Sequence, residues 1–282
     1  MIKIVTDSSV QLTPEEITQN NITVVPLSIE INGQNYIDGE TISRQEVVDA
    51  LAKGHIPKSS QPPMGKFVEV FDQLGQDGSE VVAIVLSDVL SGTFNTAQSA
   101  AQMTDTKVTV INSKSTDRGL AFQVLAAAKD AQAGKSVQEI QAHCAQIAQR
   151  TTIDVLVDSL DCLVAGGRVS KMAGMLTKLI NIKVVVRLTA DSLDVVAKGR
   201  SRKTFVKYCE QLAQNYQSNE ILELSLSNVA AEPDFLSRIK QALIGERTDV
   251  AYLARLTSPI IMTHTGLNAI GVITLRKDPV TD

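Results

Sequence analysis

The chain has 282 residues, of which 44% are apolar and 21% are charged, and its net charge is −4. This length suffices for two globular domains, each with its own core. No basic tract is present, and the chain has no Trp and only scattered Phe and Tyr. The composition therefore argues against nucleic acid and anionic membrane surfaces as main partners.

Cysteine usage and the start of the chain indicate a cytoplasmic protein. The three cysteines are far apart, which predicts neither a zinc site nor a disulfide framework, and we expect them to stay reduced. The segment from Met1 to Asp7 has a strand pattern and not that of a signal peptide. No apolar run approaches the roughly 20 residues that a membrane span needs, so we expect no stable membrane insertion.

The first half of the chain alternates strand and helix signals. Helices are predicted to begin at Thr13 and Ser43, because each is a capping residue followed three positions later by Glu. Apolar and β-branched runs bounded by turn residues predict the strands. In order, we expect strands at 2–5, 22–31, 80–86 and 107–111, a loop at 57–63, and helices from 13, at 43–53, at 65–74, after 93, at 119–132 and at 136–149.

The second half repeats this alternation with different contents. Gly166-Gly167-Arg168 is expected to form a turn. We expect strands at 155–157, 183–188, 193–198, 221–227, 249–253 and 269–275, with helices at 172–180, 203–215 and 233–243. The chain is therefore predicted to be an α/β protein of two domains. Residues 1–151 would form a mainly parallel sheet flanked by helices, and residues 152–282 an α+β domain with a mixed or antiparallel sheet.

One candidate ligand site follows the predicted strand at 80–86. There the segment from Leu90 to Thr93 leads into a helix, and ligands of open α/β sheets bind beyond the carboxyl ends of strands. The helix start offers free backbone N–H groups, and Ser91 and Thr93 add hydroxyls, which suits a carboxylate or a phosphate. Ordinary helix capping is the competing interpretation of these residues.

Two further candidate segments bear polar side chains. Ser59, Ser60 and the amide of Gln61 lie in a loop stiffened by three prolines, which suits a ligand clamp. His264 follows an apolar run, and a neutral histidine can donate or accept a hydrogen bond near pH 7. The alternatives are an ordinary surface loop and a core histidine that its neighbours satisfy.

Common catalytic motifs are missing from the sequence. It has no GxSxG elbow, no phosphate loop of the form GxxxxGKS or GxxxxGKT, no GxGxxG after the first strand and no HExxH. The polar residues therefore suit holding a chemical group more than breaking a bond. We expect neither a metal nor a cofactor.

Taken in order, several segments resemble the DegV family over nearly the full length of the chain. They are Thr6 to Ser9, Tyr36 to Gly39, Pro57 to Pro62, Leu90 to Thr93, Leu160 to Val169, Lys198 to Arg200 and His264 to Gly266. The resemblance implies a two-domain α/β architecture and fatty-acid binding near the domain junction. Family members with a known partner act as the lipid-presenting subunit of a bacterial fatty acid kinase, which phosphorylates the carboxylate to an acyl phosphate. The implied partners are thus a long-chain fatty acid and the catalytic subunit of that kinase, and the chain itself would not be an enzyme.

The resemblance also implies roles for individual residues. The fatty-acid carboxylate would be bound by Ser59, Ser60, Ser91, Thr93 and His264. Arg168 and Arg200 would lie near the pocket mouth or face the kinase. The second domain supplies apolar residues for an acyl channel, although most of them must instead form its core: Leu156, Leu160, Leu163, Met172, Met175, Leu176, Leu179, Ile180 and Ile182.

Three segments depart from the family's usual pattern. Ser59 stands where Thr is common, so it keeps the hydroxyl and lacks a methyl. Ser87-Asp88-Val89 replaces a segment that is usually Ser-Ser-Gly, and Asp88 would repel a carboxylate if its side chain pointed inward. Leu267-Asn268 replaces a usual Pro-Gly, which is expected to alter the shape of that loop.

Two other functions compete with fatty-acid binding. A hydrolase of a lipid or small ester would use Ser91 as nucleophile and His264 as base, with Asp7 or Asp88 orienting the histidine. A transcriptional or scaffold protein would need a recognition helix with clustered Lys and Arg, which the sequence does not offer.

Overall fold

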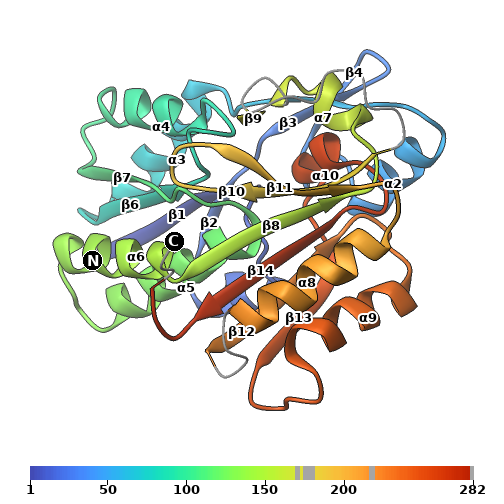
Figure 1. Ribbon diagram of the computed structural model, residues 1–282. Coiled ribbons are helices and arrows are strands. Elements are labelled where there is room, and N and C mark those ends of the chain that lie inside the picture. The colour runs from blue at the N-terminus through green and yellow to red at the C-terminus, as the bar shows by residue number, and fades with distance from the viewer. Residues whose placement is uncertain (169–171, 174–181, 216–219, 280–282) are drawn as a thin grey trace.

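The computed structural model describes residues 1–168, 172–173, 182–215 and 220–279, and Figure 1 shows its two main sheets. The first is a four-stranded parallel sheet in the order β2-β1-β6-β7. Its strands are β1 (Ile2–Asp7), β2 (Thr23–Val25), β6 (Glu80–Val85) and β7 (Val108–Asn112). The central strands β1 and β6 are short apolar runs because helices cover both of their faces.

Helices cover both faces of this parallel sheet. The helices of the first half of the chain are α1 (Pro14–Gln19), α2 (Arg44–Ala52), α3 (Met64–Gly75), α4 (Thr93–Ala101), α5 (Asp117–Gln132) and α6 (Val137–Gln149). Val5 and Ala83 point towards α3 and α4, whereas Ile4 and Val82 point towards α5 and α6. This division follows from the sequence, because successive side chains of a strand point to opposite faces.

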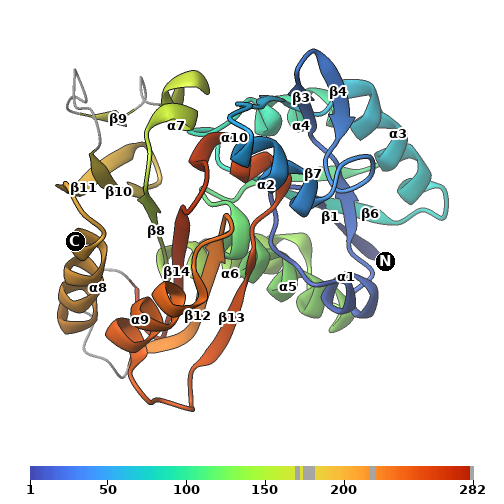
Figure 2. The ribbon, with the colours of Figure 1, turned by 90° about the vertical axis from the view of Figure 1, so that its right-hand side faces the viewer.

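The second sheet is mixed and has seven strands in the order β13-β12-β14-β8-β10-β11-β9. They are β8 (Thr151–Val157), β9 (Met172–Ala173), β10 (Lys183–Leu188), β11 (Leu193–Gly199), β12 (Ile221–Asn228), β13 (Ala251–Leu256) and β14 (Ile270–Arg276). The helices α8 (Lys203–Asn215) and α9 (Pro233–Ile244) cover one face. Figure 2 shows the other face turned towards α5, where Ile153 and Ile273 pack on Phe122.

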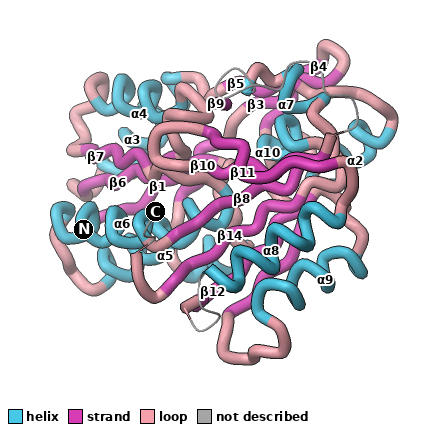
Figure 3. The backbone as a smooth tube through the Cα atoms, in the orientation of Figure 1, coloured by secondary structure: helices cyan, strands magenta, loops and turns pink. Residues whose placement is uncertain are grey.

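A small antiparallel sheet in the order β4-β3-β5 belongs to the first half of the chain and contacts α10 of the second half. Its strands are β3 (Ser28–Ile31), β4 (Gln34–Ile37) and β5 (Lys58–Ser60), and the short helices α7 (Asp161–Ala165) and α10 (Pro259–Thr265) lie near it. Figure 3 shows these elements gathered at one end of the molecule. Ile29, Val47, Ile260 and Met262 share one core, so the last part of the chain packs into the first half.

The predicted α/β class and the two kinds of sheet are confirmed. Thr13 and Ser43 each close a capping box at the start of α1 and α2. The prediction of a loop at 57–63 was wrong, because that segment contains β5. The short elements β4, α7 and α10 were not predicted.

Two other expectations have a different outcome. The helix expected at 172–180 falls almost entirely outside the described residues, and within that range residues 172–173 form β9. The domain boundary between 151 and 152 stays a prediction: β8 begins the second sheet there, while α10 returns to the first half. No helix in the described ranges is both long and apolar enough to cross a membrane.

Candidate functional site

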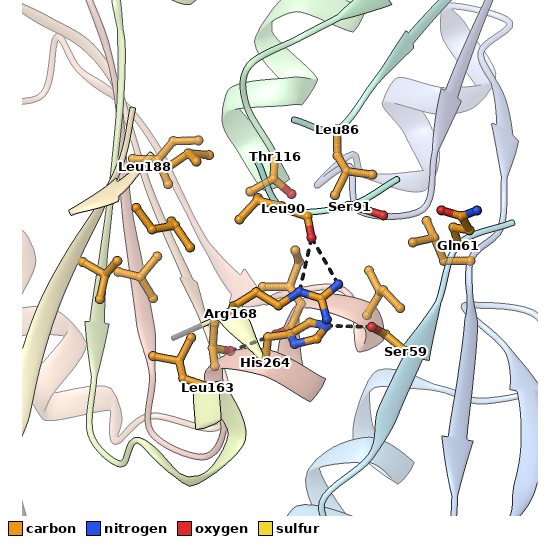
Figure 4. A pocket seen from close by; sticks show the side chains of 18 of the residues that line it. Ser59, Gln61, Leu86, Leu90, Ser91, Thr116, Leu163, Arg168, Leu188 and His264 are labelled. Atoms are coloured by element: carbon orange, nitrogen blue, oxygen red, sulfur yellow. Dashed lines mark hydrogen bonds between the residues drawn. The ribbon is translucent and has the colours of Figure 1, made fainter. Parts of the chain in front are cut away.

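A cavity of about 430 Å³ lies where the second sheet faces the first half of the chain (Figure 4). Most of its wall is apolar and comes from β8, β10, β11 and the segments around β3, β6 and α10. The apolar lining residues are Leu27, Leu86, Leu90, Ile153, Val155, Val157, Leu163, Val186, Leu188, Leu193, Ile260 and Ile261. Such a wall gives no partner to a polar ligand group and favours a hydrocarbon.

Side-chain alternation along β8 decides which residues reach the cavity. Val155 and Val157 line it, whereas Leu156 points to the opposite face and belongs to the core under α8 and α9. Of the apolar residues offered for the channel, Leu156 therefore belongs to the core, while Leu163 lines the cavity. The other predicted channel residues either pack nearby without lining it (Leu160, Ile182) or have side chains outside the described part of the chain (Met172, Met175, Leu176, Leu179, Ile180).

At the polar part of the cavity, Ser59 and His264 form a hydrogen bond of 2.7 Å between Oγ and Nε2 (Figure 4). Ser59 is held by β5, whose register places it opposite Ile29 of β3. His264 lies in the last turn of α10, which ends at Gly266 with φ of 73°, a conformation that favours glycine. Two predicted residues from distant segments are thereby brought together.

His264 is neutral at pH 7. Its burial, with a smaller effect from the nearby Arg168 guanidinium, lowers the pKa of His264 to about 3. Its Nδ1 atom is buried and has no hydrogen-bond partner among the described residues. Gly166 leaves room for the ring, because a Cβ at that position would lie 2.3 Å from Nδ1. The sequence suggested only a turn at Gly166, and its packing against the histidine could not be predicted.

Ser91 lines the cavity from the loop before α4. Its Oγ lies 2.9 Å from Oγ1 of Thr93 and accepts a hydrogen bond of 3.3 Å from the Thr93 N–H. Thr93 itself is fully buried and does not line the cavity, so it stands behind Ser91 and not at the ligand surface as predicted. Its hydroxyl therefore holds the Ser91 side chain in place.

Ser60 and Gln61 line the cavity beside Ser59, and both are exposed, so they mark where the cavity meets solvent. Ser60 was among the predicted site residues. Gln61 and Thr116 also line the cavity and were not among the predicted carboxylate-binding residues. Gln61 lay within the proline-rich segment already recognised, whereas no sequence motif marks Thr116 at the start of α5.

The two predicted arginines have different surroundings. Arg168 lines the cavity and donates to the carbonyl oxygen of Leu90 from Nε at 3.2 Å and from Nη2 at 3.1 Å. Its Nη1 donates to the carbonyl oxygen of Gly166 at 2.6 Å. Arg200 is exposed in the bend after β11 and does not line the cavity. A place at the pocket therefore fits Arg168 and not Arg200.

The groups of the alternative hydrolase do not assemble. The Ser91 hydroxyl bonds Thr93, and the partner of His264 is Ser59. The Asp7 carboxylate accepts from backbone N–H groups, and Asp88 pairs with a lysine. A histidine whose pKa is about 3 is also a poor general base at neutral pH. The geometry therefore does not favour the alternative of a Ser91 nucleophile with a His264 base.

Comparison with known proteins places this chain among its relatives. The family model described as "Uncharacterised protein, DegV family" matches residues 1–277. The chain belongs to the DegV family. A DegV domain-containing protein of Streptococcus pneumoniae serotype 4 is 37% identical to it over 274 residues, which cover 96% of this chain and 97% of that protein.

Solved structures of DegV proteins share this fold. DegV of Bacillus subtilis, described as a fatty acid binding protein, matches with a TM-score of 0.88 and 25% identity, over 98% of this chain and 99% of that chain. A stearic acid-binding protein of Eubacterium ventriosum matches with a TM-score of 0.84 and 25% identity, over the same shares. The similarity therefore extends over both sheets.

Two of the departures from the DegV pattern can be explained physically. Asp88 forms an ion pair of 3.0 Å with Lys114 and does not line the cavity, so it does not repel a ligand there. Asn268 has φ of 62°, a backbone conformation that glycine favours and asparagine tolerates. The loop after α10 thus keeps a left-handed residue where the family usually has glycine.

Proposed function

We propose that this DegV-family chain binds a long-chain fatty acid, with the hydrocarbon tail in the cavity of about 430 Å³ and the carboxylate at its polar part. The observation that carries the proposal is that one cavity combines an apolar wall with Ser59, Ser91, His264 and Arg168. The fatty acid binding described for the Bacillus subtilis and Eubacterium ventriosum relatives supports it.

The apolar wall supplies the main part of the binding free energy. Burying an acyl chain contributes roughly 0.8 kcal/mol for each CH₂ group. A long chain therefore gains on the order of 10 kcal/mol before the entropic cost of association is subtracted. A tail in this cavity would contact residues of both halves of the chain, such as Leu86 and Leu188.

The polar part must replace the water that a carboxylate loses, because an unpaired buried charge is costly. We infer that His264 carries its proton on Nε2, since a proton on the unpartnered Nδ1 would leave a buried N–H without an acceptor. His264 then donates to Ser59 Oγ, and the Ser59 hydroxyl is free to donate to the carboxylate. Ser91 offers a second hydroxyl in the same cavity.

Arg168 supports an anionic ligand for a separate reason. Its guanidinium bonds the carbonyl oxygens of Leu90 and Gly166, and within the described ranges it forms no ion pair with a carboxylate. A half-buried cation beside an apolar cavity is stabilised when an anion binds near it. The carboxylate of a fatty acid provides that charge.

The chain would present this carboxylate to a partner kinase, which would phosphorylate it to an acyl phosphate. In this proposal the partner binds the ATP, and we place the protein in the cytoplasm, where ATP is available. The exposed Ser60 and Gln61 mark the side from which the partner would approach. The exposed Arg200 would contact the kinase surface.

Native mass spectrometry of the purified protein tests the binding step. Bound lipid is first removed, either by extraction with organic solvent followed by refolding or by passage over a hydrophobic resin. The lipid-free protein is then titrated with palmitate or oleate. We expect a one-to-one complex whose added mass is that of the acid. A protein that carries no lipid and takes up neither acid would contradict the proposal. The kinase step is tested separately, by acyl phosphate formation with a fatty acid kinase catalytic subunit and ATP.

A further inference from the structure

Asp38 is a buried carboxylate that directly follows β4 and does not line the cavity. Its N–H donates to the carbonyl oxygen of Leu27 at 2.9 Å. Its Oδ2 accepts from the Ser8 hydroxyl at 2.8 Å and from the Ile260 N–H at 3.3 Å. The Ser8 Oγ in turn accepts from the Leu27 N–H at 3.0 Å. Through its side chain and its backbone N–H, Asp38 thus links the residue after β1, the residue before β3 and the first turn of α10.

The helix that Asp38 holds is the one that carries His264. α10 has seven residues and is therefore only about 10 Å long. Its capping residue Ser258 makes no side-chain hydrogen bond to the first turn, and its Oγ has no partner among the described residues. The Asp38 carboxylate accepts from the Ile260 N–H instead. At the other end of α10, His264 bonds Ser59.

Both ends of α10 are therefore tied by polar contacts to the small sheet. Asp38 follows β4 at one end, and Ser59 belongs to β5 at the other. Strand β3 connects these two positions, since it pairs with both β4 and β5. A shift of the first turn of α10 would move His264 by a similar amount, because a helix this short moves as one body.

We propose that Asp38 is a positioning residue of the head-group site, which fixes His264 at hydrogen-bond distance from Ser59 by holding the first turn of α10. The inference rests on the proposed function for its binding readout. The Ser59–His264 hydrogen bond itself can be observed without any ligand.

A carboxylate suits this task better than an apolar side chain. Apolar packing would hold α10 without a directed contact, whereas the Ile260 N–H donates to an oxygen that the Ser8 hydroxyl also holds, so the first turn is directed at a fixed acceptor. Burial raises the pKa of Asp38 to about 7, with Ser8 and the Ile260 N–H opposing that rise. The charged groups that act on it from neighbouring elements are Arg44 of α2 and Asp7 of β1.

The test compares Asp38→Ala and Asp38→Asn with a matched control, Asp130→Ala. Asp130 is buried to the same degree, 6% exposed against 4% for Asp38, and bonds Lys135 and His143 away from the cavity. We expect Asp38→Ala to weaken palmitate binding by roughly tenfold, as the loss of a buried hydrogen-bond acceptor does. Asp38→Asn keeps an acceptor oxygen and should bind palmitate within about threefold of the unaltered protein. Asp130→Ala should lower the Tm and leave the affinity unchanged.

A second readout separates positioning from loss of stability. The ¹⁵N resonance of His264 Nε2 in the lipid-free protein reports the bond to Ser59, and we expect it to shift in Asp38→Ala and not in Asp130→Ala. If Asp38→Ala does not fold, Ser8→Ala removes one of the two donors to the same carboxylate and should produce a smaller shift in the same direction. In a His264→Ala background, Asp38→Ala should change the affinity less than about twofold, because the residue it positions is gone.

Three results would overturn the inference: an unchanged affinity in Asp38→Ala, an equal loss of affinity in Asp130→Ala, or fully multiplicative losses in the double variant. A different result bears on the proposed function. If the unaltered protein takes up no fatty acid, that function fails, and the Nε2 resonance alone decides whether Asp38 positions His264.

Discussion

The Oγ atom of Ser59 and the Nε2 atom of His264 lie 2.7 Å apart, although the two residues are 205 positions apart in the chain. Strand β5 supplies the serine and helix α10 the histidine, so this hydrogen bond forms only when the last part of the chain has packed against the small sheet. Because His264 is neutral at pH 7, the pair can direct a hydroxyl at an anion without carrying charge itself. The head-group site is thus a product of tertiary structure.

Replacing Ser59 with alanine should weaken fatty-acid binding by about 10- to 100-fold, because it removes one hydrogen bond to a charged group. Isothermal titration with palmitate measures the change. The control ligand is the fatty alcohol of the same length, which contacts the same apolar wall and lacks the carboxylate. Its affinity should change much less. Equal losses for acid and alcohol would mean that Ser59 does not contact the head group.

The low pKa of His264 predicts a loss of folding stability in acid. Burial lowers this pKa from 6.5 to about 3, so between these values the unfolded chain binds a proton that the folded protein does not. The stabilising contribution is fully present above the unfolded pKa and is lost as the pH falls towards 3, by up to about 1.4 kcal/mol for each pH unit. Urea unfolding between about pH 7.5 and about pH 5 measures this slope.

The matched variant for that experiment is His264→Asn, which cannot titrate. Asp38 acts in the opposite direction, because burial raises its pKa to about 7 and its contribution falls as the pH rises. The difference between the two proteins, and not the profile of either alone, therefore isolates His264. The unaltered protein should lose stability more steeply in acid, and parallel profiles would show that His264 titrates normally in the fold.

Replacing Gly166 with alanine should displace the His264 ring, because the added Cβ would lie 2.3 Å from Nδ1. Overpacking of this kind costs roughly 1–3 kcal/mol of free energy. If moving the ring relieves this strain, the head-group site is lost in part and the affinity for palmitate should fall by roughly 10- to 100-fold. The control is Gly65→Ala in α3, where nothing lies near the added Cβ. A Gly166→Ala protein with normal affinity would show that the histidine position is unimportant for binding.

Enlarging Val155 to phenylalanine should shorten the acyl chain that the cavity accepts. Val155 lines the apolar wall from β8, so the larger ring fills space that the tail would occupy. Each CH₂ group that is excluded loses about 0.8 kcal/mol. Binding of palmitate should therefore weaken more than binding of laurate. The same substitution at Leu156, which faces the other core, should lower stability without this chain-length preference.

Local signals predicted most of the fold. The capping boxes at Thr13 and Ser43 involve residues three positions apart, and the β-branched runs depend on neighbours in the chain, so both could be recognised directly. Strand β5 could not, because Lys58-Ser59-Ser60 has little strand preference of its own. It is extended because β3 lies beside it.

The site was predicted less completely than the fold. Ser59, Ser91 and His264 were candidates from their local sequence patterns, the family resemblance assigned them to the carboxylate, and all three line the cavity. The choice between Val155 and Leu156 as lining residues depends on which face of β8 is turned inward, and composition alone does not decide this. The role of Gly166 depends on a ring from α10, a helix that the sequence pattern did not reveal.

The carboxyl resonance of palmitate labelled with ¹³C at its first carbon tests the account most directly. With one equivalent of protein, we predict a single bound resonance in slow exchange with free palmitate, and a change in its position in both Ser59→Ala and Ser91→Ala. A spectrum that shows only free or micellar palmitate in the presence of excess protein would contradict the account.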